Sequence, residues 1–182
     1  MTGEPPTWVD LLPLDDGALF AQCEFDRFRA SGSGGQKRNV TDSAVRLRHL
    51  ASGLSAEATE SRSQHENRAR ALRRLRRTIA LRLRAPVEPG SYRAPEPLAT
   101  ALHPGRGILL GRRDARFLSA VAALFDLLEL AEWRVSEAAR RLGVSTAALG
   151  RFLAQDAEVL RAANKRRREL GLRRLRRLRP GR

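Results

Sequence analysis

Cysteine is almost absent from this sequence of 182 residues, since Cys23 is the only one. A single cysteine forms no internal disulfide and builds no cysteine-rich zinc site, which excludes the disulfide-stabilised secreted scaffolds. Long apolar runs are absent too, because the longest candidate, residues 117–130, is interrupted by Ser119, Asp126 and Glu129. A membrane-spanning helix needs roughly 18 or more consecutive apolar residues. We therefore expect a soluble protein without a disulfide framework.

Acidic residues are in the minority, at 20 against 35 Lys and Arg, and the formal net charge is +15. Lys37 and Lys165 are the only lysines, so nearly all the cations are guanidinium groups, whose forked donors match phosphate oxygens. The 42% of hydrophobic residues is enough for a packed core. No Lys or Arg precedes Arg27, unlike the basic start of a secretory signal or a transit peptide. Charge and size together favour a folded, cytoplasmic protein that binds nucleic acid.

Proline is unevenly spread, and five of the nine prolines lie between residues 86 and 104. Neither a helix nor a central strand continues through such a stretch. We therefore expect a Pro/Gly-rich linker over residues 86–113. It separates a domain over residues 10–85 from a helical module over residues 114–171, which is followed by a basic C-terminal tail over residues 172–182.

The first domain combines strand and helix patterns. Val45 and Leu47 alternate with arginines within residues 44–50, which is the period of a half-buried strand. From Ser63 the apolar spacing changes to three and four, which predicts a long Arg-rich helix to about residue 84. The other expected elements are a short helix within 14–22, an extended segment at 23–29 and a weaker strand at 54–60. The fold class is therefore α+β, with a short β-sheet and one long helix.

The second module carries only helical patterns. Asp114 is expected to cap its first helix, and Ser136 a second helix that stops at Gly143. Ser145 and Asp156 are expected to open the third and fourth helices. A glycine between two short helices is typical of a helix-turn-helix unit. We expect an all-α, helix-turn-helix-like module, with a basic tail that orders on a polyanion.

Ordinary catalytic patterns are missing, because no His, Cys and carboxylate cluster has metal spacing and no P-loop occurs. We expect neither a metal site nor a cofactor. The remaining candidate is the expected loop Ser31 to Lys37. Its adjacent glycines, Gly34 and Gly35, let the backbone approach another molecule closely. Gln36 supplies no general base, so chemistry there relies on positioning a water and on backbone N–H donors that stabilise an oxyanion.

Three stretches stand in a specific order and spacing: FRASGSGGQKRN at 28–39, TDSAVRL at 41–47 followed by His49 and Gly53, and RSQHENRARAL at 62–72. Together they resemble the catalytic domain of class I peptide chain release factors. In that family the Gly-Gly-Gln loop enters the ribosomal peptidyl-transferase centre and promotes hydrolysis of the ester that joins a nascent peptide to tRNA.

The resemblance implies roles for the loop residues. Gln36 orders the attacking water and lends its backbone N–H to the transition state, while Gly34 and Gly35 let the loop fit. The loop is supported by Ser31, Gly32 and Ser33. Two departures stand out: Ser33 replaces the family's frequent Pro or Ala, and Lys37-Arg38 replaces the commoner His-Val pair.

Cations in three regions are expected to bind ribosomal RNA. Those in the first domain are Lys37, Arg38, Arg62, Arg68, Arg73 and Arg76. Those near the C-terminus are Lys165, Arg166, Arg167, Arg173, Arg174, Arg176 and Arg177.

A domain that reads stop codons is not expected, because only about 14 residues precede the release-factor-like region. The resemblance then favours codon-independent ribosome-rescue peptidyl-tRNA hydrolases, whose basic tail occupies the empty mRNA channel. The expected partners are the ribosome with its peptidyl-tRNA and a methyltransferase that modifies Gln36, and the expected state is a monomer. A non-catalytic RNA-binding protein with the same fold is the first alternative, and a helix-turn-helix DNA-binding regulator is the second.

Overall fold

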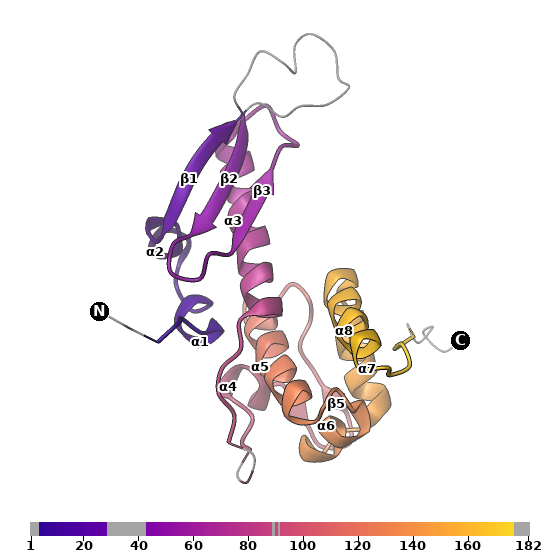
Figure 1. Cartoon of the computed structure of the whole chain (residues 1–182). Helices are drawn as coiled ribbons and strands as arrows, with labels where there is room; N and C mark the ends of the chain where they lie inside the picture. Colours follow the sequence, from indigo (N-terminus) through magenta and orange to yellow (C-terminus); the bar gives the residue numbers. More distant parts are fainter. Residues whose placement is uncertain (1–3, 29–42, 89, 91, 177–182) are drawn as a thin grey trace. The chain divides into compact units, whose positions relative to one another are not determined.

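The computed structural model describes residues 4–28, 43–88, 90 and 92–176 (Figure 1). The chain divides into two compact units, residues 1–83 and residues 84–182. Within the described ranges, no helix is long and apolar enough to cross a membrane.

The first unit contains a three-stranded antiparallel sheet of order β1-β2-β3. Its elements are α1 (Trp8–Leu11), α2 (Asp16–Ala21), β1 (Cys23–Phe28), β2 (Ala44–His49), β3 (Ser55–Ala58) and α3 (Gln64–Arg82). Figure 1 shows α3 running behind the strands, and it packs on β2 and β3. The α+β class expected from the sequence is thus found in this unit.

The alternation in β2 explains which face of the sheet α3 covers. Val45 and Leu47 are fully buried, while Arg46 and Arg48 between them are exposed. Successive side chains of a strand point to opposite faces, so one face of β2 is apolar and the other charged. On α3, Leu75 contributes to the same core.

Local caps fix the helix starts in this unit. The Asp15 carboxylate accepts a hydrogen bond from the Ala18 N–H at 2.8 Å, and the Ser63 hydroxyl accepts one from the Glu66 N–H at 3.3 Å. Side-chain oxygens at these positions satisfy amide groups that have no partner inside the helix. The expected starts near Asp15 and Ser63 are confirmed.

The second unit is mostly helical. Its elements are α4 (Glu96–Ala99), β4 (Leu102–His103), β5 (Gly107–Ile108), α5 (Phe117–Leu130), α6 (Val135–Arg141), α7 (Thr146–Ala154) and α8 (Ala157–Glu169). The apolar α5 lies at its centre, and Leu124, Leu127 and Leu128 are fully buried there. Residues 114–171 form only helices, as expected, whereas the antiparallel pair of β4 and β5 lies before them, in the stretch expected to be a linker.

The expected linker over residues 86–113 is wrong where α4, β4 and β5 form. Leu98, Ala101 and Leu110 are buried, α4 packs on α5, and β5 packs on α7. Proline misled the prediction because it is tolerated in the first turn of a helix, where its missing N–H costs no hydrogen bond. Pro95 is the residue before α4, and Pro97 lies in its first turn.

Two of the four expected caps in this unit are wrong. The Asp114 carboxylate accepts the Arg116 N–H at 2.8 Å and leaves α5 without a side-chain cap. Ser136 lies inside α6, whose first flanking residue is Arg134. Both helices begin without a side-chain cap because packing of α5 and α6 in the unit fixes their starts, and apolar Phe117 and Val135 are buried there.

The other local signals in this unit are confirmed. The Ser145 hydroxyl accepts the Ala148 N–H at 3.1 Å, and the Asp156 carboxylate accepts the Glu158 N–H at 2.8 Å. Gly143 follows α6 with a φ of +64°, a conformation that glycine adopts without steric cost. Helices α6 and α7 contact each other across this turn.

Candidate functional site

The Gly-Gly-Gln segment, residues 29–42, joins β1 to β2 in the sequence. Eight expected site residues belong to it and lie outside the described residues: Ser31, Gly32, Ser33, Gly34, Gly35, Gln36, Lys37 and Arg38. Both of its flanks are described, because Phe28 at the end of β1 pairs with Ala44 at the start of β2. The segment therefore starts and finishes at one end of the sheet.

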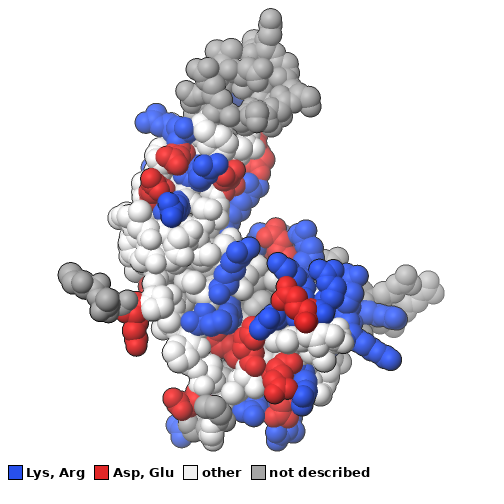
Figure 2. Space-filling model, viewed as in Figure 1, with Lys and Arg blue, Asp and Glu red and all other residues white. Residues whose placement is uncertain are grey.

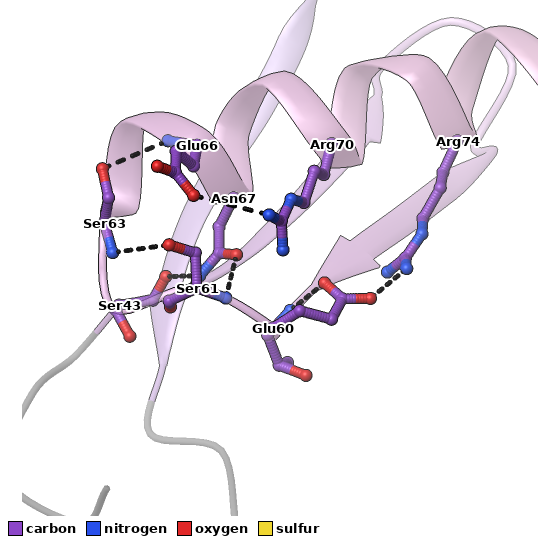
Figure 3. Close-up of polar contacts among 9 residues, drawn as sticks. Ser43, Glu60, Ser61, Ser63, Glu66, Asn67, Arg70 and Arg74 are labelled. Atoms are coloured by element: carbon purple, nitrogen blue, oxygen red, sulfur yellow. Dashed lines mark hydrogen bonds and ion pairs between the residues drawn. The ribbon is translucent and has the colours of Figure 1, made fainter. Parts of the chain in front are cut away.

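Asn67 holds the residue that follows this segment (Figure 3). Its Nδ2 donates to the Ser43 carbonyl at 2.6 Å and to the Ser61 carbonyl at 2.8 Å, and its Oδ1 accepts the Ser61 N–H at 2.9 Å. Asn67 is fully buried, where an unsatisfied amide is costly. The first turn of α3 is thereby fastened both to the C-terminal flank of the segment and to the turn after β3.

Sequence reasoning gave Asn67 no role, although a signal was available. Positions 67, 71, 75 and 79 recur at intervals of four on α3, and all four are buried. An amide in the first position of such an apolar series is a polar group on the buried face. Such a group requires hydrogen-bond partners, and here the partners come from other elements.

A second polar contact continues along α3 in the same view. Arg74 forms an ion pair with Glu60 and donates to the Glu57 carbonyl at 2.5 Å. Hydrogen bonding from Arg74 lowers the pKa of Glu60, so this carboxylate stays charged at neutral pH. Arg70 lies one turn earlier and pairs with Glu66 at 3.4 Å. Both arginines are therefore engaged within the domain itself.

The four expected RNA-binding arginines at α3 have different surroundings. Arg62 and Arg73 are exposed, and neither makes an ion pair within the described part of the chain. Arg68 is exposed as well, with its guanidinium 5.1 Å from the centre of the Phe20 ring. Arg76 is mostly buried and is engaged with the N-terminal segment. We therefore no longer count Arg76 among the cations available to RNA.

The Arg76 side chain joins α3 to the N-terminal segment through two backbone carbonyls and one carboxylate. Its guanidinium donates to the Leu12 carbonyl at 3.1 Å, the Leu14 carbonyl at 2.7 Å and the Asp16 carboxylate at 2.8 Å. A guanidinium group has five N–H donors, so most of them are used here. The function of Arg76 is to hold α1 and α2 against the long helix.

The open face of the sheet carries charges of both signs, which Figure 2 shows intermixed. Arg46 pairs with Glu57 at 2.6 Å, and Arg48 lies 3.8 Å from Glu24. Pairing of this kind cancels the local field, so this face is poorly suited to a polyanion.

The C-terminal cations fall into two groups. Arg166 pairs with Glu129 at 3.2 Å, and Arg167 donates to the carbonyls of Trp133 and Arg173, so both are used within the unit. Burial lowers the pKa of Arg167. The exposed members are Lys165, Arg173, Arg174 and Arg176, while Arg177 lies outside the described residues.

The helix-turn-helix unit offers little to nucleic-acid bases. Arg140 and Arg141 both pair with Glu137, and their hydrogen bonds lower the pKa of that carboxyl to about 2. On α7, Thr146 and Arg151 are the exposed polar side chains able to reach base edges. Among the described residues, no group of three or more His, Cys, Asp or Glu could hold a metal ion.

Comparisons with known proteins agree with the resemblance in the sequence. The RF-1 domain family matches residues 20–94. Peptide chain release factor 1 of Leptothrix cholodnii is 55% identical over 64 residues, which is 35% of this chain and 17% of that protein. The protein of the same name from Chlamydia abortus is 54% identical over 68 residues, or 36% of this chain and 19% of that protein.

A third relative, peptide chain release factor 1 of Verminephrobacter eiseniae, is 60% identical over 52 residues, which is 29% of this chain and 14% of that protein. The chain thus spans less than a fifth of the length of these relatives. Strands β1 to β3 and helix α3 lie within the matched region. Residues 20–94 therefore belong to the RF-1 domain family, which is the catalytic-domain family of class I peptide chain release factors.

Proposed function

We propose that this protein is a release factor that hydrolyses peptidyl-tRNA on the ribosome without reading a stop codon. The observation that carries the proposal is the Gly34-Gly35-Gln36 sequence, which lies between β1 and β2 of a domain of this family. Hydrolysis is the activity that two adjacent glycines and a glutamine suit, because it needs neither a metal nor a side-chain base.

The proposed reaction is an attack by water on the ester carbonyl carbon. Gln36 positions the water, and its backbone N–H stabilises the negative charge that develops on the carbonyl oxygen. The bond between that carbon and the tRNA ribose oxygen then breaks, and the ribose oxygen takes up a proton. Gly34 and Gly35 let the backbone come close to the ester because neither carries a side chain.

The proposed RNA contacts are electrostatic. In the first unit they come from Lys37, Arg38, Arg62, Arg68 and Arg73. In the second unit they come from Lys165, Arg173, Arg174, Arg176 and Arg177, with Arg166 and Arg167 as supports. Contacts of this kind bind phosphates whatever the bases are. This is our reason for proposing codon-independent release, and hence ribosome rescue.

Release of labelled peptide from ribosomes stalled on an mRNA without a stop codon tests the proposal. We expect release by the wild-type protein and its loss in Gln36→Ala and Gly35→Ala. Gly111→Ala is the matched control, since Gly111 is exposed and a Cβ there meets no atom within 4 Å. Codon independence requires equal release when a sense codon or a stop codon occupies the decoding site.

The non-catalytic alternative makes a different prediction for the same assay. Ribosome binding without peptide release by the wild-type protein overturns the hydrolase and favours an RNA-binding protein that retains the fold. Release only at stop codons overturns codon independence and leaves hydrolysis intact.

A further inference from the structure

The chain reverses direction after α8 and runs back beside it. Gly171, with a φ of +69°, makes the turn, and the Leu172 N–H donates to the Arg167 carbonyl at 2.8 Å. Residues 172–176, which we call the strap, form no helix or strand.

Asn164 on α8 fastens the strap by a two-way amide contact. Its Oδ1 accepts the Leu175 N–H at 2.7 Å, and its Nδ2 donates to the Leu175 carbonyl at 3.1 Å. The Arg167 guanidinium makes the second contact with the strap. Its Nε donates to the Arg173 carbonyl at 2.9 Å, and one of its terminal nitrogens donates to the same carbonyl at 2.7 Å. The strap is thus held at two places, and both contacts leave its own arginine side chains unused.

A basic groove lies between α8 and the strap. It consists of two adjoining hollows, of about 620 Å³ and 960 Å³, that share Asn164 and Arg174. Arg161, Lys165 and Arg168 line it from α8, where spacings of four and three place them on one helix face. Figure 2 shows Lys and Arg side chains gathered over this part of the second unit.

The groove has a surplus of positive charge. Glu158 is the one acidic residue that lines it, and it lies 4.0 Å from Arg161. Lys165, Arg168 and Arg174 make no ion pair with any described residue. The lining includes no aromatic side chain, so bases have no ring to stack on. A groove of this composition suits a row of phosphates and is indifferent to sequence.

We propose that this groove is a preformed binding site for the phosphate backbone of RNA, and that Asn164 is the residue that sets its geometry. We choose RNA as the polyanion because this inference rests on the proposed function at the ribosome, where the phosphates belong to RNA. Without the Asn164 contacts the strap arginines have to be ordered at the moment of binding, which weakens affinity even though no charge is lost.

Two full-length variants separate geometry from charge. Asn164→Ala keeps every cation and removes the two hydrogen bonds between the Asn164 amide and the Leu175 backbone. The triple variant Arg161→Gln, Lys165→Gln, Arg168→Gln keeps Asn164 and removes three groove cations. Its matched control is Arg106→Gln, Arg112→Gln, Arg113→Gln, which removes equal charge at exposed positions outside the groove.

The measurement is fluorescence anisotropy of a labelled single-stranded RNA of mixed sequence, titrated at several salt concentrations. We expect Asn164→Ala to weaken binding about tenfold, which corresponds to ordering a few side chains. The groove triple variant is expected to make the plot of log affinity against log salt less steep by about two. Each lost phosphate contact accounts for about 0.7 of this change. Hydrogen exchange at the Leu175 amide is expected to be slow in the wild type and fast in Asn164→Ala.

Failure of this inference is distinguishable from failure of the proposed hydrolase. Unchanged RNA affinity in Asn164→Ala together with fast Leu175 exchange overturns the role of Asn164. Equal salt slopes for the groove and control triple variants overturn the groove, and so does tighter binding of single-stranded DNA of the same sequence. Peptide release is scored separately on Gln36→Ala, so either result stands without the other.

Discussion

The Nδ2 of Asn67 lies 2.6 Å from the carbonyl oxygen of Ser43, which joins the first turn of α3 to the residue that follows the Gly-Gly-Gln segment (Figure 3). The contact spans 24 residues of sequence. Since β1 and β2 hold the other flank through the Phe28 and Ala44 pair, the sheet and α3 together fix where the segment leaves and re-enters the domain.

Replacing Asn67 with alanine is expected to lower the free energy of unfolding of the first unit by about 2–4 kcal/mol, because three backbone groups of Ser43 and Ser61 lose their partner. Fluorescence of buried Trp8 during urea unfolding, in a Trp133→Phe background, reports this unit alone. Gln64→Ala on the same helix is the control. A loss no larger than that of the control contradicts the role assigned to Asn67.

Arg73 and Arg76 are expected to respond in opposite ways. Arg76→Gln removes hydrogen bonds to Leu12, Leu14 and Asp16 and should cost about 2–3 kcal/mol in the same unfolding measurement. Exposed Arg73→Gln should stay within about 0.5 kcal/mol of the wild type. In a ribosome-binding assay the order reverses, with Arg73→Gln the weaker binder. A destabilised Arg73→Gln with intact ribosome affinity would falsify this division of roles.

Gly107→Ala tests whether β5 packs on α7. The φ of Gly107 is +90°, and a Cβ added there lies 2.6 Å from the Cβ of Ala148. Strain and overpacking together should cost the second unit about 2–4 kcal/mol, read from Trp133 fluorescence in a Trp8→Phe background. Gly105→Ala separates the two effects, because its φ is +70° but no atom lies within 4 Å. Equal losses in the two variants contradict the packing.

His49 is expected to make the first unit less stable in mild acid. It is fully buried; its Nδ1 accepts the Ser52 N–H at 3.2 Å, and its Nε2 donates to the Gln22 amide oxygen at 3.1 Å. Burial lowers the pKa of His49, so below its usual value of about 6.5 the unfolded chain binds the proton more readily than the folded one. This contribution to stability is complete above that pH and is lost as the pH falls.

The check is the unfolding free energy of the first unit at about pH 7.5 and about pH 5. His49→Gln should show a smaller loss over this range than the wild type, and His65→Gln, at an exposed position, should match the wild type. Identical pH dependence in all three proteins would remove His49 as the cause.

Local patterns were sufficient for much of the first unit. The alternation around Val45 and Leu47 predicted β2, and Ser63 predicted the start of α3, because strand pleating and helix capping depend on neighbouring residues. The same holds for Ser145 and Gly143 in the second unit. The local rule failed at Ser136, where packing and not a cap sets the start of α6.

The sequence alone determined the α+β class, the starts of α2, α3, α7 and α8, the positive charge and the release-factor resemblance. Tertiary structure decided which polar groups meet across the chain: Asn67 with Ser43, Arg76 with Leu12 and Leu14, and Asn164 with Leu175. It also decided that residues 96–110 pack into the second unit. The reason is physical: backbone preferences act over a few residues, whereas these contacts form only after apolar faces distant in sequence are buried together.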